Sequence, residues 1–343
     1  MDSKVNTNNN DQPKKNILIS GGAGFIGSHL CEELVRQGHQ VICLDNFITG
    51  TRMNIEFLLQ LPNFHFIKHD IVDPIDLESL PELKSLNLQT LGLQEVYNLA
   101  CPTSYREYKE LPLETLLTNS HGTRNMLEIA VRYKAKFLHV STSSVYGEPL
   151  AKMKFFKEDY WGYVSPIGPR SAYNEGKRFA ECLTYNYGEY HGIQTKIARI
   201  FQTYGPRMRF DDARLIPDMI RAALRNEDLV IYGEPGKTTS FLYITDLVEG
   251  LIKYMQADYG GVLNFGYPKE VEIEEAAKII ISLTGSSSKI TYEDSPPFIV
   301  KHGLPDITRA KDILGWFPLI DLQTGLSKTI DYMKAQKDLL KLT

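Results

Sequence analysis

The sequence predicts an α/β protein with a doubly wound parallel sheet of the Rossmann type and a second, smaller α/β substrate lobe. Short apolar strands alternate with helix-length segments between residues 16 and 200, which is typical of a parallel sheet built from βαβ units. A glycine-rich turn joins the first strand to the first helix. The chain has 343 residues, and single hydrophobic cores stop growing at roughly 250–300 residues. Two lobes are therefore expected.

The first part of the chain reads as a regular succession of strands and helices. The first strand, 17–19, runs through SGGAGFIGS into a helix at 29–37, which Gly38 ends. Further strands are expected at 40–44, 64–67, 95–99, 136–140 and 194–200, and helices at 115–133 and 173–191. This part should form the cofactor-binding sheet.

After Pro206 the pattern becomes looser. It predicts a helix at 215–225, a strand at 229–232, and amphipathic helices at 272–284 and 322–337. The expected domains are a disordered lead-in at 1–15, a Rossmann domain at 16–200 plus about 241–268, and a substrate-binding lobe at about 201–240 plus 269–343.

Composition favours a soluble protein with a small-molecule substrate. The net charge of -4 lacks the basic excess of a nucleic-acid binder, so no nucleic-acid partner is expected. The four cysteines are scattered, without zinc spacing or disulfide density, and predict a reducing cytosol and no metal. The polar amino terminus has no signal-like apolar core, and no apolar run approaches ~18 residues. A cytoplasmic protein without membrane contact is expected.

The glycine-rich turn predicts a dinucleotide site. Gly21, Gly24 and Gly27 form G-x-x-G-x-x-G between strand and helix, where bare backbone lets a pyrophosphate approach the helix amino terminus. Asp45 ends the next strand, where a carboxylate would bind the adenosine ribose and repel a 2′-phosphate. NAD is therefore favoured over NADP. A tight turn beside a solvated strand end remains the structural alternative.

A Tyr-x-x-x-Lys pair predicts an oxidation site. Tyr173 and Lys177 lie one turn apart on a helix, and Ser141-Thr142-Ser143-Ser144 follows an earlier strand. Removing a hydroxyl proton while hydride leaves the same carbon needs a phenolate. Bringing a tyrosine from its usual pKa near 10 toward neutrality costs ~4 kcal/mol, which a nearby ammonium and a positive nicotinamide could supply. A Tyr-x-x-x-Lys pair without further motifs usually lies on the protein surface and has no catalytic role.

These motifs occur together, and in combination the chain resembles the extended short-chain dehydrogenase/reductase family. The resemblance spans about residues 16–318 and includes SGGAGFIGS, STSSVYGE and RIFQTYGP. Within the family the chain is most similar to the UDP-glucuronate decarboxylases, through NLACPTSY, SPIGPRSAYNEGKR and PDITRAKDILGW. The resemblance implies NAD as the cofactor, a UDP-sugar as the substrate, and a homodimer.

The resemblance also implies roles for individual residues. Thr142 or Ser143 would bind the sugar hydroxyl, Tyr173 would be the base, and Lys177 would hold the nicotinamide ribose and lower the tyrosine pKa. The expected cofactor contacts are Gly21, Ala23, Gly24, Phe25, Ile26, Gly27, Asp45, Asn46, Asp70, Ile71, Leu99, Ala100, Tyr173 and Lys177. The candidate substrate contacts are Tyr105, Tyr108, Arg170, Gln202, Arg207, Arg214 and Tyr243.

Four positions depart from the decarboxylase pattern. Ser144 stands where Glu is usual and Thr239 where Arg is usual, while Gln202 replaces Asn and Asn174 replaces Asp. A hydroxyl at position 144 cannot act as a base near pH 7. The preferred interpretation is therefore a UDP-sugar 4-epimerase, which needs only the oxidation residues. Decarboxylation is the alternative, because a C4 ketone beside a C5 carboxylate loses carbon dioxide without a dedicated base. A non-catalytic NAD-binding sensor or scaffold is the alternative of another class.

Overall fold

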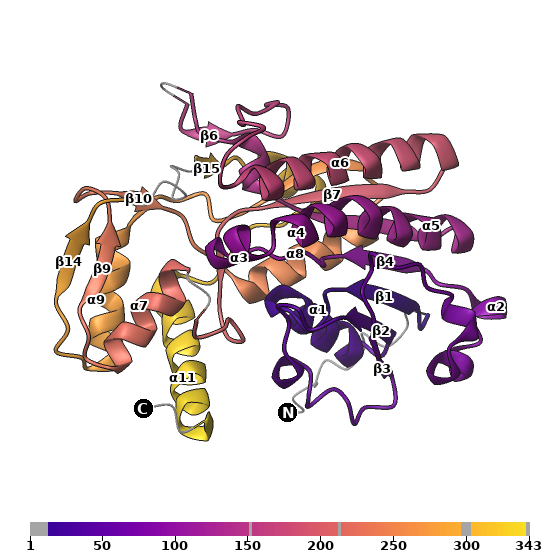
Figure 1. Ribbon diagram of the computed structural model, residues 1–343, viewed down its shortest axis with the longest axis horizontal. Coiled ribbons are helices and arrows are strands. Elements are labelled where there is room, and N and C mark those ends of the chain that lie inside the picture. The colour runs from indigo at the N-terminus through magenta and orange to yellow at the C-terminus, as the bar shows by residue number, and fades with distance from the viewer. Residues whose placement is uncertain (1–12, 151–152, 212–213, 296–302, 341–343) are drawn as a thin grey trace, which may run out of the picture.

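A computed structural model describes residues 13–150, 153–211, 214–295 and 303–340 (Figure 1). The predicted Rossmann fold is confirmed: seven strands form one parallel sheet in the order β12-β7-β5-β4-β1-β2-β3. The strands are β1 (Asn16–Ser20), β2 (Gln40–Asp45), β3 (Phe64–Lys68), β4 (Glu95–Asn98), β5 (Lys136–Thr142), β7 (Thr195–Ile200) and β12 (Gly261–Phe265). Strand order reverses beside β1, the point where ligands bind in open α/β sheets. Most of the predicted lead-in, residues 1–12, lies outside the described residues.

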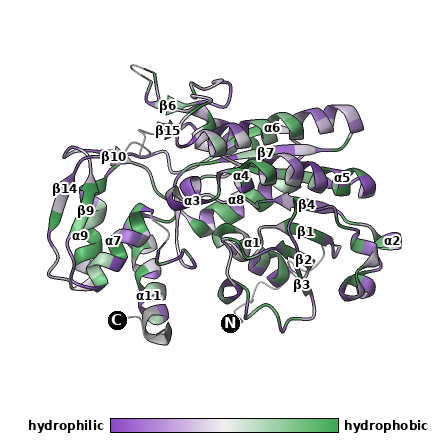
Figure 2. Cartoon of the chain, viewed as in Figure 1, coloured by the Kyte–Doolittle hydropathy of each residue, from purple (hydrophilic) through white to green (hydrophobic). Residues whose placement is uncertain are grey.

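Helices cover both faces of the sheet. Successive side chains of β1 point to opposite faces and belong to two different hydrophobic cores. Ile17 and Ile19 pack with α1 (Phe25–Arg36) and α8 (Ile244–Gln256), whereas Leu18 packs with α5 (Thr123–Tyr133). The longest helix of the described chain, α6 (Ser171–His191), runs along the same face as α5 (Figure 1). Figure 2 shows these helices alternating between hydrophobic and hydrophilic residues along their length, as expected for helices that bury one side.

A second group of elements lies beside the carboxyl ends of the strands. It contains three helices, α7 (Leu215–Leu224), α9 (Ile273–Thr284) and α11 (Leu322–Leu340). A parallel pair, β9 (Leu229–Tyr232) and β14 (Ile290–Glu293), packs near them (Figure 1). Their apolar residues join the core beneath α1 and α8. The division into two lobes at the expected residue boundaries stays a prediction.

The described chain also contains short α-helices and strands, besides four short 3-10 helices at Arg52–Asn54, Leu77–Ser79, Pro81–Leu86 and Ser143–Tyr146. The short α-helices and strands are α2 (Leu88–Leu91), α3 (Tyr105–Glu110), α4 (Pro112–Leu117), β6 (Phe155–Phe156), β8 (Thr203–Tyr204), β10 (Thr238–Thr239), β11 (Leu242–Tyr243), β13 (Val271–Glu272), β15 (Leu304–Pro305) and α10 (Thr308–Leu314). Several of them connect the sheet to the second group. β8 pairs in parallel with β11, and β10 pairs antiparallel with β13.

Two helices differ from the sequence-based expectation. The first helix begins at Phe25 rather than at residue 29, because the Ser28 N–H already donates to the Gly24 carbonyl at 3.0 Å. The predicted helix at 115–133 contains a π-helical turn, Thr118–Gly122, between α4 and α5. Within that turn the side-chain amide of Asn119 donates to the Thr115 carbonyl at 2.8 Å. A side chain therefore takes up a backbone carbonyl that an α-helix would bond to a backbone N–H.

Candidate active site

A large cavity opens at the carboxyl ends of the central strands. Its volume is about 1380 Å³, and the segments that follow β1, β2, β4, β5 and β7 line it together with residues of α6 and α7. Pockets for drug-sized ligands usually measure about 300–1,000 Å³. The cavity can therefore hold a dinucleotide and a second ligand together.

The glycine turn lies at one end of this cavity. Gly21 adopts a left-handed backbone with φ of +71°, and a Cβ on Gly27 would lie 2.1 Å from the Gly21 carbonyl oxygen. Gly24 caps α1 without a side chain, so the first N–H groups of the helix face the cavity without a side-chain acceptor. This bare helix start can receive an anion such as a pyrophosphate.

Asp45 is hydrogen-bonded to the backbone of the glycine turn. Its carboxylate accepts the Ala23 N–H at 2.9 Å and the Phe47 N–H at 2.8 Å. Burial raises the pKa of Asp45, and these two N–H donors oppose that rise. Asn46, which follows β2, donates to the Asp70 carboxylate at 2.9 Å, so the segments that follow β2 and β3 are joined at the wall of the cavity.

The expected oxidation residues meet further along the cavity. Tyr173 and Lys177 line it from α6, and Thr142, Ser143 and Ser144 line it from the end of β5. The Lys177 ammonium donates to the Val140 carbonyl at 2.8 Å, which holds α6 against β5. The Tyr-x-x-x-Lys pair and the Thr-Ser-Ser segment, which are about thirty residues apart in the sequence, thus line the same cavity.

Burial and neighbouring groups act on the pKa of Tyr173 in opposite directions, and the lowering expected from Lys177 stays a prediction. Burial raises the pKa of Tyr173 to about 12, while a hydrogen bond to Thr142 and the charges of Arg214 and Arg170 lower it. Burial lowers the pKa of Lys177. The phenol is therefore protonated near pH 7 in this state, and a further positive charge is needed to make it a base.

Most of the expected substrate contacts line the cavity, but Tyr243 does not. Its side chain is only 3% exposed and packs edge-on against Tyr204, with ring centroids 5.6 Å apart, because β11 pairs with β8 in the interior. The side chain of Tyr105 lies outside the described part of the structure. The expected contacts that line the cavity are Tyr108, Arg170, Gln202, Arg207 and Arg214. Arg207 is also bonded to Glu32 of α1.

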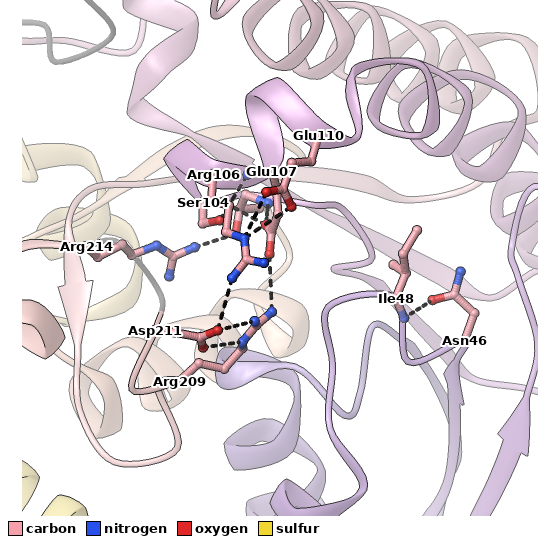
Figure 3. A network of polar contacts seen from close by, with 10 residues as sticks. Asn46, Ile48, Ser104, Arg106, Glu107, Glu110, Arg209, Asp211 and Arg214 are labelled. Carbon is pink, nitrogen blue, oxygen red and sulfur yellow. Dashed lines mark hydrogen bonds and ion pairs between the residues drawn. The ribbon is translucent and has the colours of Figure 1, made fainter. Parts of the chain in front are cut away.

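A charged network that the sequence did not predict joins α3 to the segment of Arg209 and Asp211 (Figure 3). Arg106 of α3 and Arg209 converge on Asp211, at 3.2 and 3.0 Å, and Arg209 also approaches Glu107. Nearby, Arg214 donates to Thr103. The capping box of α3, Ser-x-x-Glu, was visible in the sequence, but its ion pairs across more than a hundred residues were not.

Three of the four departures from the decarboxylase pattern face the same cavity. Ser144, Gln202 and Thr239 all line it. Thr239 donates to the Gln202 side-chain oxygen at 3.0 Å, and Ser144 accepts a hydrogen bond from Arg170 at 3.0 Å. Among these three cavity positions, neutral hydroxyl groups thus occupy the two where the pattern has a charged side chain, Ser144 and Thr239.

The described residues contain no group of three or more His, Cys, Asp and Glu side chains placed to hold a metal ion. Within the same ranges, every helix is too short or too polar to cross a bilayer.

Comparisons with known proteins agree with this fold and site. The model of the GDP-mannose 4,6 dehydratase family matches residues 18–329. The chain therefore belongs to the extended short-chain dehydrogenase/reductase family of enzymes that modify nucleotide sugars. The resemblance seen in the sequence is confirmed.

Particular relatives include decarboxylases and epimerases. UDP-glucuronic acid decarboxylase 1 of Xenopus tropicalis is 41% identical over 95% of this chain and 74% of its own length. UDP-glucuronic acid decarboxylase 5 of Arabidopsis thaliana is 43% identical over 92% of this chain and 88% of its own length. The structure of UDP-glucuronic acid 4-epimerase from Bacillus cereus with UDP-glucuronic acid and NAD is 31% identical, with a TM-score of 0.81, covering 94% of this chain and 99% of that one.

Proposed function

We propose that this enzyme is an NAD-dependent UDP-glucuronate decarboxylase that oxidises the sugar at C4 before the carboxyl group leaves. The convergence of Thr142, Tyr173 and Lys177 on one cavity with the glycine turn carries the proposal. The relatives with 41–43% identity are named decarboxylases, which favours this reaction over the epimerisation preferred from the sequence alone. The preference for epimerisation is unconfirmed.

The residues of the glycine turn fit a dinucleotide. A Cβ on Gly21 would lie 2.7 Å from the Ala100 nitrogen, so glycine lets the turn pack against the segment after β4, and Gly24 and Gly27 present bare backbone to the cavity beside it. NAD bound there would accept and return the hydride. Asp45 would take the adenosine ribose and Lys177 the nicotinamide ribose, while Tyr173 takes the proton of the C4 hydroxyl.

The proposed decarboxylation is redox neutral and needs no base at position 144. Oxidation at C4 places a ketone β to the carboxylate, so the C5–C6 bond breaks with its electrons delocalised into the ketone. Carbon dioxide leaves, C5 takes up a proton, and the hydride returns to C4. Ser144 can therefore stand in place of a glutamate without blocking the net reaction.

Epimerisation at C4 is the second candidate, because Ser144 and Thr239 present only hydroxyl groups to the cavity. The deciding experiment incubates the purified enzyme with UDP-glucuronate and follows the products by NMR. A UDP-pentose supports decarboxylation, whereas UDP-galacturonate overturns it in favour of epimerisation. An enzyme that binds NAD but converts no UDP-sugar would be a sensor or scaffold.

Asp45 should set the preference for NAD. Replacing it with Ala removes a carboxylate that would bind the ribose and that also holds the Ala23 N–H. We expect weaker NAD binding and a smaller gap between NAD and NADP, measured by titration calorimetry with each dinucleotide. Tighter binding of NADP than of NAD by the wild-type enzyme would contradict the ribose assignment.

The predicted homodimer should form through α4 and α6. These neighbouring helices expose apolar side chains, with Leu113 of α4 68% exposed and Phe179 of α6 51% exposed. A Phe179→Glu substitution would bury a carboxylate in that interface, and we expect a shift to monomer in light scattering. A matched Tyr190→Glu change nearer the end of α6 should leave the dimer intact. Dissociation by Tyr190→Glu alone would place the interface elsewhere.

The cytoplasmic location stays a prediction.

A further inference from the structure

The end of β5 is hydrogen-bonded to one face of α6. Tyr173 is bonded to Thr142, and Lys177 donates at 2.8 Å to the backbone carbonyl that precedes Ser141. One turn further along α6, Glu181 accepts a hydrogen bond from the Ser141 hydroxyl at 2.5 Å. Side chains four residues apart lie on the same face of a helix. Successive turns of α6 thus hold three consecutive residues of β5.

Glu181 is a buried carboxylate whose position is fixed by Arg199 of β7. It is only 8% exposed, and Arg199 donates to its two oxygens at 2.9 and 2.7 Å. A guanidinium that binds a carboxylate through two N–H groups fixes the orientation of the carboxylate. Because buried polar networks with all their partners are rigid, the Ser141 hydroxyl meets an acceptor of fixed position.

Arg199 also contacts the far end of the segment that contains Thr142. Its guanidinium carbon lies 4.6 Å from the centroid of the Tyr146 ring, within the range of a cation–π contact. Tyr146 is the last residue of the 3-10 helix that follows Thr142. The ion pair of Glu181 and Arg199 therefore holds the segment 141–146 at both of its ends.

We infer that Glu181 is a positioning residue of the oxidation site, which acts through Ser141 to fix the hydroxyl of Thr142 against Tyr173. The inference rests on the proposed function, in which Tyr173 takes the proton of the C4 hydroxyl. Glu181 does not line the cavity, so it acts on the substrate only through its neighbours. A displacement of about 1 Å at a reacting centre can cost roughly 10²-fold in rate, so a bond one residue away from Thr142 matters for turnover.

Ser141→Ala removes the hydroxyl that Glu181 holds and leaves the ion pair with Arg199 in place. We expect kcat for UDP-glucuronate to fall about tenfold, less than the loss from a full 1 Å displacement. KM, NAD affinity and the unfolding temperature should stay close to those of the wild type. The isotope effect of C4-deuterated UDP-glucuronate on kcat should be at least as large as in the wild type, because hydride transfer is the step that slows.

Thr184→Val is the matched control. Thr184 is also a buried residue of α6, but its hydroxyl donates within the helix, to the Ala180 carbonyl at 2.7 Å. The substitution removes a buried hydroxyl at nearly constant volume and should leave kcat unchanged. Unchanged kcat in Ser141→Ala, a loss that appears in KM alone, a smaller isotope effect, or an equal loss in Thr184→Val would overturn the inference.

A second variant removes the anchor itself. Glu181→Met combined with Arg199→Met replaces a buried ion pair by apolar side chains, a change that often preserves stability. It should lower kcat as Ser141→Ala does, and adding Ser141→Ala to it should cost nothing more, because the bond is already lost. A further fall in kcat would show that Ser141, which lines the cavity, acts on the ligand directly, and would overturn the inference.

The same measurements separate this inference from the proposed function. Wild-type enzyme that converts no UDP-sugar would refute the proposed function, on which the inference rests. Wild-type turnover of UDP-glucuronate together with an unaffected Ser141→Ala variant would refute the inference alone.

Discussion

Tyr173→Phe should lose at least ~10²-fold in turnover, the lower bound for a positioned base. The phenol is the group of α6 that faces the cavity beside Thr142, and the substitution removes only its oxygen. Initial rates with UDP-glucuronate at saturating NAD measure the effect. The unfolding temperature and NAD affinity should stay close to those of the wild type, because the ring still packs against Tyr108. A variant that keeps most of its turnover would identify another base.

The pH dependence of turnover should follow the same group. Burial raises the pKa of Tyr173 to about 12, so the deprotonated base becomes more abundant as pH rises toward that value. Turnover should therefore increase with pH on the acidic side of its profile. Because the charge of Arg214 lowers the pKa of Tyr173, Arg214→Met should displace this limb to higher pH. A displacement to lower pH would contradict the assignment.

Gly27→Ala should abolish NAD binding and destabilise the fold. The new Cβ would lie 2.1 Å from the Gly21 carbonyl oxygen and 2.8 Å from the Gly22 Cα, both backbone atoms that cannot rotate away. Overpacking of this kind costs typically about 1–3 kcal/mol, and the forced movement opens the turn that receives the pyrophosphate. Denaturant unfolding and calorimetric titration with NAD measure the two effects.

Gly24→Ala is the matched control for that substitution. Its Cβ would meet only the Gly21 oxygen, at 3.2 Å, which a small backbone adjustment can relieve. We expect a loss of stability of less than about 1 kcal/mol, below the usual cost of overpacking. Equal destabilisation by the two substitutions would show that close packing at Gly27 does not determine the shape of the turn.

The sheet and the glycine turn could be predicted from the sequence because both depend on local patterns. Parallel strands buried on two faces read as continuous apolar runs, as in Ile17-Leu18-Ile19. The turn needs glycine at the positions where two backbone segments touch, so the spacing of the glycines identifies the turn in the sequence. The Tyr173 and Lys177 pair was found for the same reason, since one helical turn separates them.

Contacts between distant segments could not be predicted in this way. Tyr243 was expected in the site, yet the pairing of β11 with β8 turns its ring toward the interior. The bond between Arg170 and Ser144 joins the start of α6 to the end of β5, and no sequence spacing specifies it. Such contacts depend on how whole elements pack.

The ion pairs between α3 and the segment of Arg209 and Asp211 have a consequence for how firmly these two segments are held together. Arg106 and Asp211 are each about half exposed, at 51% and 54%, so water and salt surround the link between them. Exposed pairs of this kind contribute only about 0–1 kcal/mol and weaken further as ionic strength rises. The two segments are thus joined by ion pairs that are easily and reversibly broken. Raising the ionic strength should therefore loosen the contact between α3 and the segment that carries Arg209 and Asp211.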